Sequence, residues 1–173
     1  MGDRRLLMGD PKAFTMVTLF EKFLELIDVL SKEAVDYVLI GGFAVILYGM
    51  PRLTQDIDLF LRNDAENIRR LQDALFEVFQ DASIREITVD ELDRYPVIRY
   101  GSPDGFSIDL IVKIGATFGY DDLEYDLIEV EGRRIRVATA ETLYRLKKGT
   151  VRPIDQNDAA FLAELLRHRK EKE

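Results

Sequence analysis

The stretch Tyr37–Leu61, YVLIGGFAVILYGMPRLTQDIDLFL, decides the fold of this chain. Its first residues, Tyr37 to Ile40, are all apolar and predict a buried strand. The pair Gly41-Gly42 predicts a tight turn, and the apolar residues after it predict a short buried helix. A second apolar strand follows, so the order is strand, glycine turn, helix and a strand that carries two acids.

The two acids of the second strand, Asp56 and Asp58, share one face, because successive side chains of a strand point to opposite faces. Ile57 and Leu59 point the other way and predict a core there. Two neighbouring carboxylates repel each other unless a cation lies between them, and their oxygens suit a hard ion such as Mg²⁺. The glycine pair adds a predicted anion site, since free amides at the start of a helix favour phosphate oxygens. Together these features predict metal-assisted transfer from a nucleoside triphosphate.

A third acid follows later in the chain. The segment Phe106–Val112 places Asp109 among apolar neighbours. It belongs to Phe106–Ile114, which with Val97–Tyr100 predicts the two arms of a hairpin that turns at Ser102–Gly105. A carboxylate is costly to bury in such a strand unless a nearby cation compensates it. Asp109 is therefore the candidate third carboxylate of the same site.

The motif Arg52-x-Thr54-x-Asp56-Ile57-Asp58-Leu59 follows the glycine pair and precedes the later strand acid. This ordered set resembles the pattern of the nucleotidyltransferase superfamily that includes DNA polymerase beta. In its details it is most similar to the AbiEii-like nucleotidyltransferases of bacterial abortive-infection and toxin-antitoxin systems, and the matching elements run from about Tyr37 to about Leu166. The resemblance implies an α+β nucleotidyltransferase fold, in which a mixed, mostly antiparallel sheet is flanked by helices and followed by C-terminal helices.

The resemblance also implies roles for the matching residues. The catalytic and metal-binding residues would be Asp56, Asp58 and Asp109, which would hold two Mg²⁺ ions, with Mn²⁺ as the alternative. Asp109 would also help to deprotonate the attacking hydroxyl. Lys147 stands where AbiEii-like proteins often have a lysine, and its charge could hold a phosphate. The predicted nucleotide-binding residues are Gly41, Gly42, Arg52, Thr54 and Lys147, and the amides of the two glycines would bind the leaving pyrophosphate.

Two of these matches leave alternatives open. Arg52 either contacts a phosphate or pairs with one of the acids. The segment 152–158 resembles an Arg-Pro-Lys-Asp-x-x-Asp segment of the AbiEii-like proteins, but Ile154 replaces the lysine. A structural role is the alternative for this segment. In that role Asp155 would cap the last helix, and Asp158 would lie in its first turn.

The 173 residues carry a formal net charge of −8 and no cysteine. The acidity disfavours an extended footprint on nucleic acid, and the lack of cysteine excludes disulfides and thiolate metal sites. We expect a cytoplasmic protein without a membrane span, since no stretch reaches the ~20 apolar residues that a span needs. Residues 133–152 are rich in Arg and Lys and either hold a triphosphate or an RNA end, or form a solvated face.

We predict a flexible arm over residues 1–12 and a single domain over residues 13–173. Helices are expected at Phe14–Leu30, Phe43–Tyr48 and Ala65–Phe79, from a Thr139 cap to Lys148, and at Asp155–Arg169. Further strands are expected at Ser83–Val89, Leu127–Val130 and Arg134–Val137.

The leading functional hypothesis is Mg²⁺-dependent transfer of a nucleoside monophosphate from a nucleoside triphosphate to a hydroxyl. The acceptor would be RNA, a protein or a small molecule, in a toxin-antitoxin or phage-defence setting. A partner protein or a second copy of the chain would help to build the acceptor site. The alternative is a catalytically silent nucleotide-binding or interaction module with the same fold, although the presence of all three acids favours the enzyme.

Overall fold

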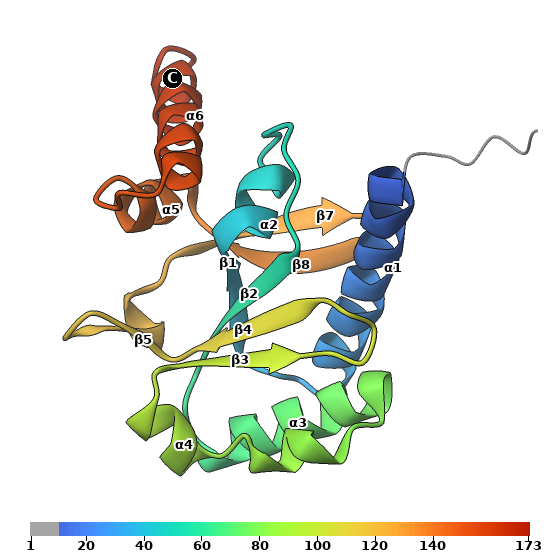
Figure 1. The fold of residues 1–173 in the computed structure, drawn as a ribbon. Helices are drawn as coiled ribbons and strands as arrows, with labels where there is room; N and C mark the ends of the chain where they lie inside the picture. The colour runs from blue at the N-terminus through green and yellow to red at the C-terminus, as the bar shows by residue number, and fades with distance from the viewer. Residues whose placement is uncertain (1–10) are drawn as a thin grey trace, which may run out of the picture.

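The computed structural model describes residues 11–173. The arm predicted for residues 1–12 lies outside the described residues except for its last two positions, which begin the first helix. The helices and 3-10 turns are α1 (Pro11–Lys32), α2 (Gly41–Leu47), α3 (Ala65–Phe79), η1 (Ala82–Glu86), α4 (Val89–Arg94), η2 (Tyr120–Asp122), α5 (Ala140–Lys147) and α6 (Pro153–Lys170). Figure 1 shows α3 and α4 below the central strands and α6 standing at the opposite end, beside α5.

The strands form one large sheet and one small hairpin. Their bounds are β1 (Tyr37–Ile40), β2 (Asp56–Leu61), β3 (Val97–Gly101), β4 (Ser107–Ile111), β5 (Lys113–Ile114), β6 (Phe118–Gly119), β7 (Tyr125–Val130) and β8 (Arg133–Ala138). The large sheet has the order β3-β4-β2-β1-β8-β7, and β5 pairs with β6. Pairing is antiparallel for β1/β2, β3/β4 and β7/β8, and parallel for β2/β4 and β1/β8. The mixed, mostly antiparallel sheet of the predicted α+β fold is confirmed.

The core of the sheet comes from the apolar positions that the sequence pattern identified. Ile57 and Leu59 of β2 and Ile108 and Leu110 of β4 are fully buried, each at 0% exposure. The strands alternate, so the acids between these residues are driven to the other face. Burial of each such side chain stabilises the fold by about 1.5 to 3 kcal/mol, which fixes the register of both strands.

Side-chain caps set several helix ends as the sequence predicts. The Asp64 carboxylate accepts from the Asn67 amide at the start of α3, and the Thr139 hydroxyl accepts from the Thr142 amide at the start of α5. Each such cap satisfies an amide that has no partner within its helix. The predicted bounds of α3 are therefore confirmed, and α5 begins directly after its predicted cap.

The strand predicted at Ser83–Val89 is wrong. The Asp81 carboxylate accepts from the Ser83 amide and opens η1, and the Thr88 hydroxyl accepts from the Glu91 amide and opens α4. Local capping therefore wins over the alternating pattern, which arises because Ile84 faces the core from a 3-10 turn. The short helix α4 follows directly after η1 and Thr88.

The last helix also begins differently from the prediction. Arg152 is its N-cap residue and Pro153 is its first residue, a position at which proline is preorganised for a helix. Asp155 thus lies inside α6 and is not its cap, and its carboxylate is used elsewhere. No described helix is long and apolar enough to cross a membrane.

Candidate active site

The three predicted acids lie on one face of two adjacent strands. Asp58 of β2 and Asp109 of β4 are direct partners in the parallel pairing, and Asp56 pairs with Ser107 two positions earlier. Residues in register on neighbouring strands place their side chains on the same face. The structure therefore brings Asp56, Asp58 and Asp109 together, and we refer to them as the acid row.

Asp58 is the member of the acid row whose pKa is shifted by burial. Burial, followed by the negative charges of Asp109 and Asp56, raises its pKa to about 6. The positive charges of Lys147 and Arg99 act in the opposite direction. A carboxylate in this state is stabilised by any additional cation that reaches it.

Arg99 of β3 is a member of the site that the sequence reasoning missed. It pairs with Asp109 across the antiparallel strands, so both side chains share a face. Its Nε and Nη2 donate to the two Asp109 oxygens at 2.8 Å each, and Nη2 lies 3.7 Å from an Asp56 oxygen. A signal was available in the sequence, because a hairpin that turns around Asp104 places residues 99 and 109 opposite each other.

The donor set of the acid row suits a hard divalent cation, since it offers only carboxylate oxygens. Among the described residues, however, no three His, Cys, Asp or Glu side chains are already arranged around a common metal position. The contact of Arg99 gives a physical reason, because its guanidinium occupies both oxygens of Asp109. The Arg99 guanidinium is itself a cation among these acids, and its presence indicates that the acid row has a position for a cation. The residues fit a metal ion once Asp109 is released.

The acid row forms one side of a cleft of about 470 Å³, which we call the acid cleft. Its other lining residues come mainly from the turn before α2, the loop before β2 and the start of α6. The lining residues are Gly41, Gly42, Arg52, Leu53, Thr54, Gln55, Asp56, Asp58, Arg99, Asp109, Lys147, Arg152, Ile154 and Asp155. All eight residues predicted for catalysis, metal or nucleotide binding therefore line one cleft.

The two glycines at the start of α2 are required by close contacts. Gly41 has a φ of +71°, and a Cβ there would lie 2.1 Å from an Asp58 carboxylate oxygen. A Cβ on Gly42 would lie 2.5 Å from Arg52 Nη2 and 2.9 Å from Thr54 Oγ1. The glycine pair thus lets Asp58 and the loop before β2 approach the turn, which the sequence alone explained by phosphate binding.

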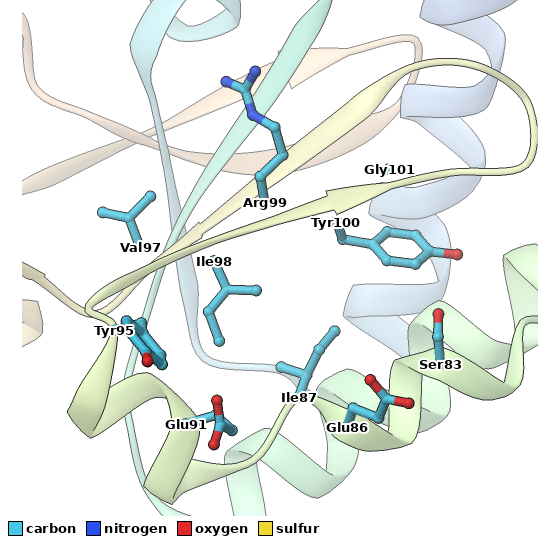
Figure 2. A pocket seen from close by; sticks show the side chains of 10 residues that line it. All are labelled: Ser83, Glu86, Ile87, Glu91, Tyr95, Val97, Ile98, Arg99, Tyr100 and Gly101. Atoms are coloured by element: carbon cyan, nitrogen blue, oxygen red, sulfur yellow. The ribbon is translucent and has the colours of Figure 1, made fainter.

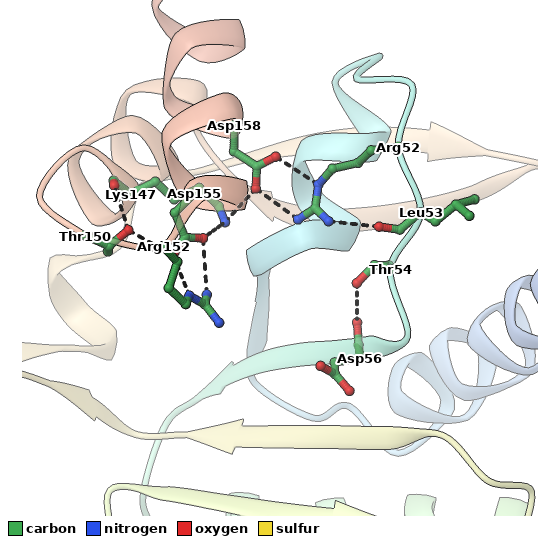
Figure 3. Close-up of polar contacts among 9 residues, drawn as sticks. All are labelled: Arg52, Leu53, Thr54, Asp56, Lys147, Thr150, Arg152, Asp155 and Asp158. Atoms are coloured by element: carbon green, nitrogen blue, oxygen red, sulfur yellow. Dashed lines mark hydrogen bonds and ion pairs between the residues drawn. The ribbon is translucent and has the colours of Figure 1, made fainter.

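A buried ion network lies on the other side of the acid cleft and consists of Arg52, Lys147, Arg152, Asp155 and Asp158. Arg52 Nε lies 2.8 Å from an Asp158 oxygen, so the arginine pairs with α6 and not with the acid row. Lys147 Nζ lies 2.9 Å from Asp155 and 2.8 Å from Asp158. Figure 3 shows how these contacts connect the loop before β2 to the start of α6.

Asp155 is the centre of this network. Its carboxylate accepts from Lys147, Thr150 and Arg152 at 2.7 to 3.1 Å. Burial alone would raise its pKa, but the hydrogen bonds from Arg152, Lys147 and Thr150 outweigh burial and hold the pKa well below its usual range. Asp155 and Asp158 therefore take the structural role that was open to the segment 152–158, although through ion pairs and not through a helix cap.

The basic residues of the segment 133–152 do not form one surface. Arg133 donates to Asp28 of α1, and Arg136 donates to Asp36 before β1. Lys147 is buried in the ion network, whereas Arg152 lines the acid cleft with a side chain that is 72% exposed. Of these residues, only Lys147 and Arg152 line the acid cleft.

A second hollow of about 720 Å³, the edge groove, lies beneath the edge strand β3. Its lining residues are Ser83, Glu86, Ile87, Glu91, Tyr95, Val97, Ile98, Arg99, Tyr100 and Gly101. Figure 2 shows Ile98 facing Ile87 across this groove, while the Arg99 side chain leaves β3 on the opposite side. The edge groove and the acid row therefore lie on different sides of β3.

Comparison with solved structures agrees with this architecture. The lincosamide antibiotic adenylyltransferase LnuA, bound to lincomycin, has 15% sequence identity and a TM-score of 0.53 over 83% of this chain and 95% of LnuA. JHP933 from Helicobacter pylori has 17% identity and a TM-score of 0.50 over 90% of this chain and 67% of JHP933. TM1012 from Thermotoga maritima has 16% identity and a TM-score of 0.48 over 99% and 100% of the two chains. At such identities, the first two similarities show a shared fold.

The sequence itself shows the family. No curated protein matches the chain. Residues 22–166 match the family described as nucleotidyl transferase AbiEii toxin, type IV toxin-antitoxin system. This match covers most of the chain and includes the glycine turn, the acid row and the buried ion network, so the chain belongs to the AbiEii nucleotidyltransferase toxin family.

Proposed function

We propose that this chain is a Mg²⁺-dependent nucleotidyltransferase that moves a nucleoside monophosphate from a nucleoside triphosphate to a hydroxyl acceptor. One observation carries the proposal: Asp56, Asp58 and Asp109 share one sheet face in a cleft whose other lining includes Lys147 and Arg152. Such a cleft has carboxylates for metal ions and cations for phosphates in reach of each other. We propose residues 13–173 as the single unit that performs this reaction.

The proposed reaction follows from these positions. The acceptor oxygen attacks the α-phosphorus and forms a new phosphorus–oxygen bond, while the bond to the bridging oxygen of pyrophosphate breaks. Asp109 accepts the hydroxyl proton, and Asp56, Asp58 and Asp109 would hold the metal ions. Bound Mg²⁺, or Mn²⁺ in its place, would supply neutralisation of the charge that develops on the phosphate oxygens.

The phosphate contacts are assigned by exposure and charge. Arg152 is the foremost candidate, because it lines the cleft and its side chain is exposed. Lys147 contributes positive charge from the wall, since its Nζ is already paired with two aspartates. We keep Gly41 and Gly42 as the position of the leaving pyrophosphate, with Thr54 beside them.

The setting proposed for this reaction is a toxin-antitoxin system in the bacterial cytoplasm, in keeping with the family description. RNA or a protein is the expected acceptor class. A partner protein or a second copy of the chain is expected to help hold it. No membrane is involved in this proposal.

The experiment that tests the proposal is transfer from each of four α-labelled nucleoside triphosphates with Mg²⁺ into total RNA and into protein. The test variant is Asp56→Ala/Asp58→Ala. The matched control is Asp121→Ala/Asp122→Ala, which removes two exposed aspartates that do not line the acid cleft. We expect labelling by the wild type and by the control variant and at least a 10³-fold loss in the test variant, about 4 kcal/mol of transition-state stabilisation.

A third acceptor in the same experiment tests the small-molecule alternative. LnuA is named as a lincosamide adenylyltransferase, so lincomycin is the probe for this arm. Label in lincomycin and not in RNA or protein would change the acceptor class. Nucleotide binding without transfer to any acceptor, in the presence of the partner protein, would favour the silent binding module.

A further inference from the structure

The guanidinium of Arg99 occupies a central position in the acid row. The acids Asp56, Asp58 and Asp109 carry three formal negative charges when ionised, and Arg99 is the cation that hydrogen-bonds to Asp109 and lies 3.7 Å from Asp56. Its two parallel hydrogen bonds to Asp109 form the bidentate geometry that gives arginine–carboxylate pairs their strength and direction. The guanidinium therefore neutralises part of the negative charge that a metal ion would neutralise among these carboxylates.

The two partners of this ion pair differ in their freedom to move. The Asp109 side chain is 14% exposed and lies on β4, between β3 and β2. The Arg99 side chain is 60% exposed and comes from the edge strand β3. Because the guanidinium is in contact with water, separating this pair costs less than separating a fully buried pair, and the arginine is the partner that is free to leave. The carboxylate would stay in the position that the sheet gives it.

A metal ion and Arg99 compete for the same lone pairs. Both Asp109 oxygens accept from the guanidinium, and the nearest Asp56 oxygen lies 3.7 Å from Nη2. A hard divalent ion binds carboxylate oxygens at about 2.0 to 2.6 Å, and the repulsion between two cations on one carboxylate disfavours joint occupancy. Binding at Asp109 is thus an exchange of one cation for another.

We propose that Arg99 is the resident counter-cation of the acid row and must leave Asp109 before a divalent ion can bind there. This inference rests on the proposed function, because it assigns a regulatory step to the same metal site. Arg99 neutralises part of the negative charge of the acid row in the free chain and keeps Asp109 from acting as a base in the absence of metal. It acts through Asp109 and is a positioning residue.

The exchange couples metal binding to nucleotide binding. The displaced guanidinium remains at the acid cleft, which it lines, and the oxygens of an incoming triphosphate offer it a new partner. The triphosphate therefore lowers the cost of moving Arg99, and metal and triphosphate each strengthen the binding of the other by the same factor. Without Arg99 this part of the coupling disappears.

The test measures Mn²⁺ binding by electron paramagnetic resonance of the free ion, with the whole chain and no nucleotide. The variants are Arg99→Gln, Arg99→Lys and the control Arg85→Gln. Arg85 is matched in charge, in exposure and in its 2.9 Å ion pair with an aspartate, but it does not line the acid cleft. We expect Arg99→Gln to bind Mn²⁺ about tenfold more tightly than wild type, Arg99→Lys to be intermediate and Arg85→Gln to be unchanged.

Addition of tripolyphosphate gives the second part of the test. It should tighten Mn²⁺ binding to wild type more than to Arg99→Gln, because only the wild type has to relocate the guanidinium. Equal or weaker Mn²⁺ binding by Arg99→Gln would overturn the inference and leave the proposed function intact. Mn²⁺ binding by Asp58→Asn that equals binding by the wild type would instead contradict the proposed metal site. Mn²⁺ binding by none of the proteins would overturn both the inference and the proposed function.

A measurement on the wild type guards against misfolding of the variants. The Nε–H resonance of Arg99, assigned by its absence in Arg99→Gln or Arg99→Lys, reports its contact with Asp109. Titration with Mg²⁺ and tripolyphosphate should shift this resonance strongly if the guanidinium leaves. An unchanged resonance at saturating Mg²⁺ would show that metal and arginine do not exchange, and the inference would fail.

Discussion

Two groups of charged residues face the acid cleft, and they are balanced in opposite ways. The acid row has three carboxylates and one arginine, and that arginine is mostly exposed. The buried ion network has three cations for two carboxylates, and both carboxylates are almost fully enclosed, with Asp158 at 0% and Asp155 at 2% exposure. The row has an excess of negative charge and the network an excess of positive charge.

This difference in charge balance distinguishes the acid row, as a candidate binding site, from the buried ion network, as a structural scaffold. Each carboxylate of the network has its partners within the chain, and the ion pairs connect the loop before β2 to α5 and α6. The acids of the row repel one another, and this raises the pKa of Asp58 further once burial has raised it. A group that is left unbalanced in the free protein gains the most from an added cation, whereas a network whose carboxylates are already ion-paired gains little.

The comparison predicts the largest effect at Asp158. In Asp158→Asn, Arg52 and Lys147 would lose a buried counter-charge at contacts of 2.8 to 2.9 Å. We expect the free energy of unfolding to fall by about 3 to 5 kcal/mol, measured by urea titration. The control is Asp73→Asn, which breaks exposed ion pairs and should cost at most about 1 kcal/mol. Equal effects in the two variants would contradict a scaffold role for the network.

Gly41→Ala should have the next largest effect on the free energy of unfolding. The new Cβ would meet Asp58 and sit on a backbone with φ of +71°, so we expect a loss of about 2 to 3 kcal/mol and weaker Mn²⁺ binding. Gly49→Ala is the control, because its φ is +106° but no atom lies within 4 Å of its Cβ. The excess loss in Gly41→Ala, in urea titrations of both variants, measures the contact with Asp58. No excess would mean that the turn does not hold Asp58 in place.

Asp58→Asn should have the opposite sign to Asp158→Asn. In the metal-free chain at pH 8 we expect the free energy of unfolding to rise by about 1 to 3 kcal/mol, because a shift from 3.8 to about 6 makes the ionised form costly in the folded state. The penalty exists above about pH 6 and vanishes as the pH falls below about 4, where Asp58 is protonated in both states. Urea titrations at pH 8 and pH 4, in the presence of a chelator, test this. A destabilised variant at pH 8 would contradict the repulsion.

The smallest predicted effect is a pH dependence at Asp155. Its pKa is lowered in the folded chain, so the stability that the ionised group contributes is present above about pH 4 and is lost as the pH falls from there. Asp155→Asn lacks this contribution. We expect the stability difference between wild type and variant to shrink by about 1 to 2 kcal/mol between pH 7 and pH 3, measured by urea titration. A constant difference would show that Asp155 acts through packing alone.

Several of these positions were predictable from the sequence. The alternation around Asp56 and Asp58 gave their common face, and the single acid in an apolar strand gave Asp109. Arg99 was missed although the hairpin register contained it, because a surface arginine carries no pattern of its own. The strand expected at Ser83–Val89 is wrong because side-chain caps start η1 and α4 there, in spite of the alternating pattern.

The sequence by itself determined the family, the strand, turn, helix and strand unit, and the residues of the acid row, because these depend on local periodicity and on order along the chain. The tertiary structure alone decided the partners of Arg52 and Lys147. Their aspartates lie on α6, and Asp158 is 106 residues from Arg52 in the chain. The ion pair of Arg52 crosses this separation, and the ion pairs of Lys147 connect α5 to α6. Both depend on how α5 and α6 pack, and no local pattern encodes that packing.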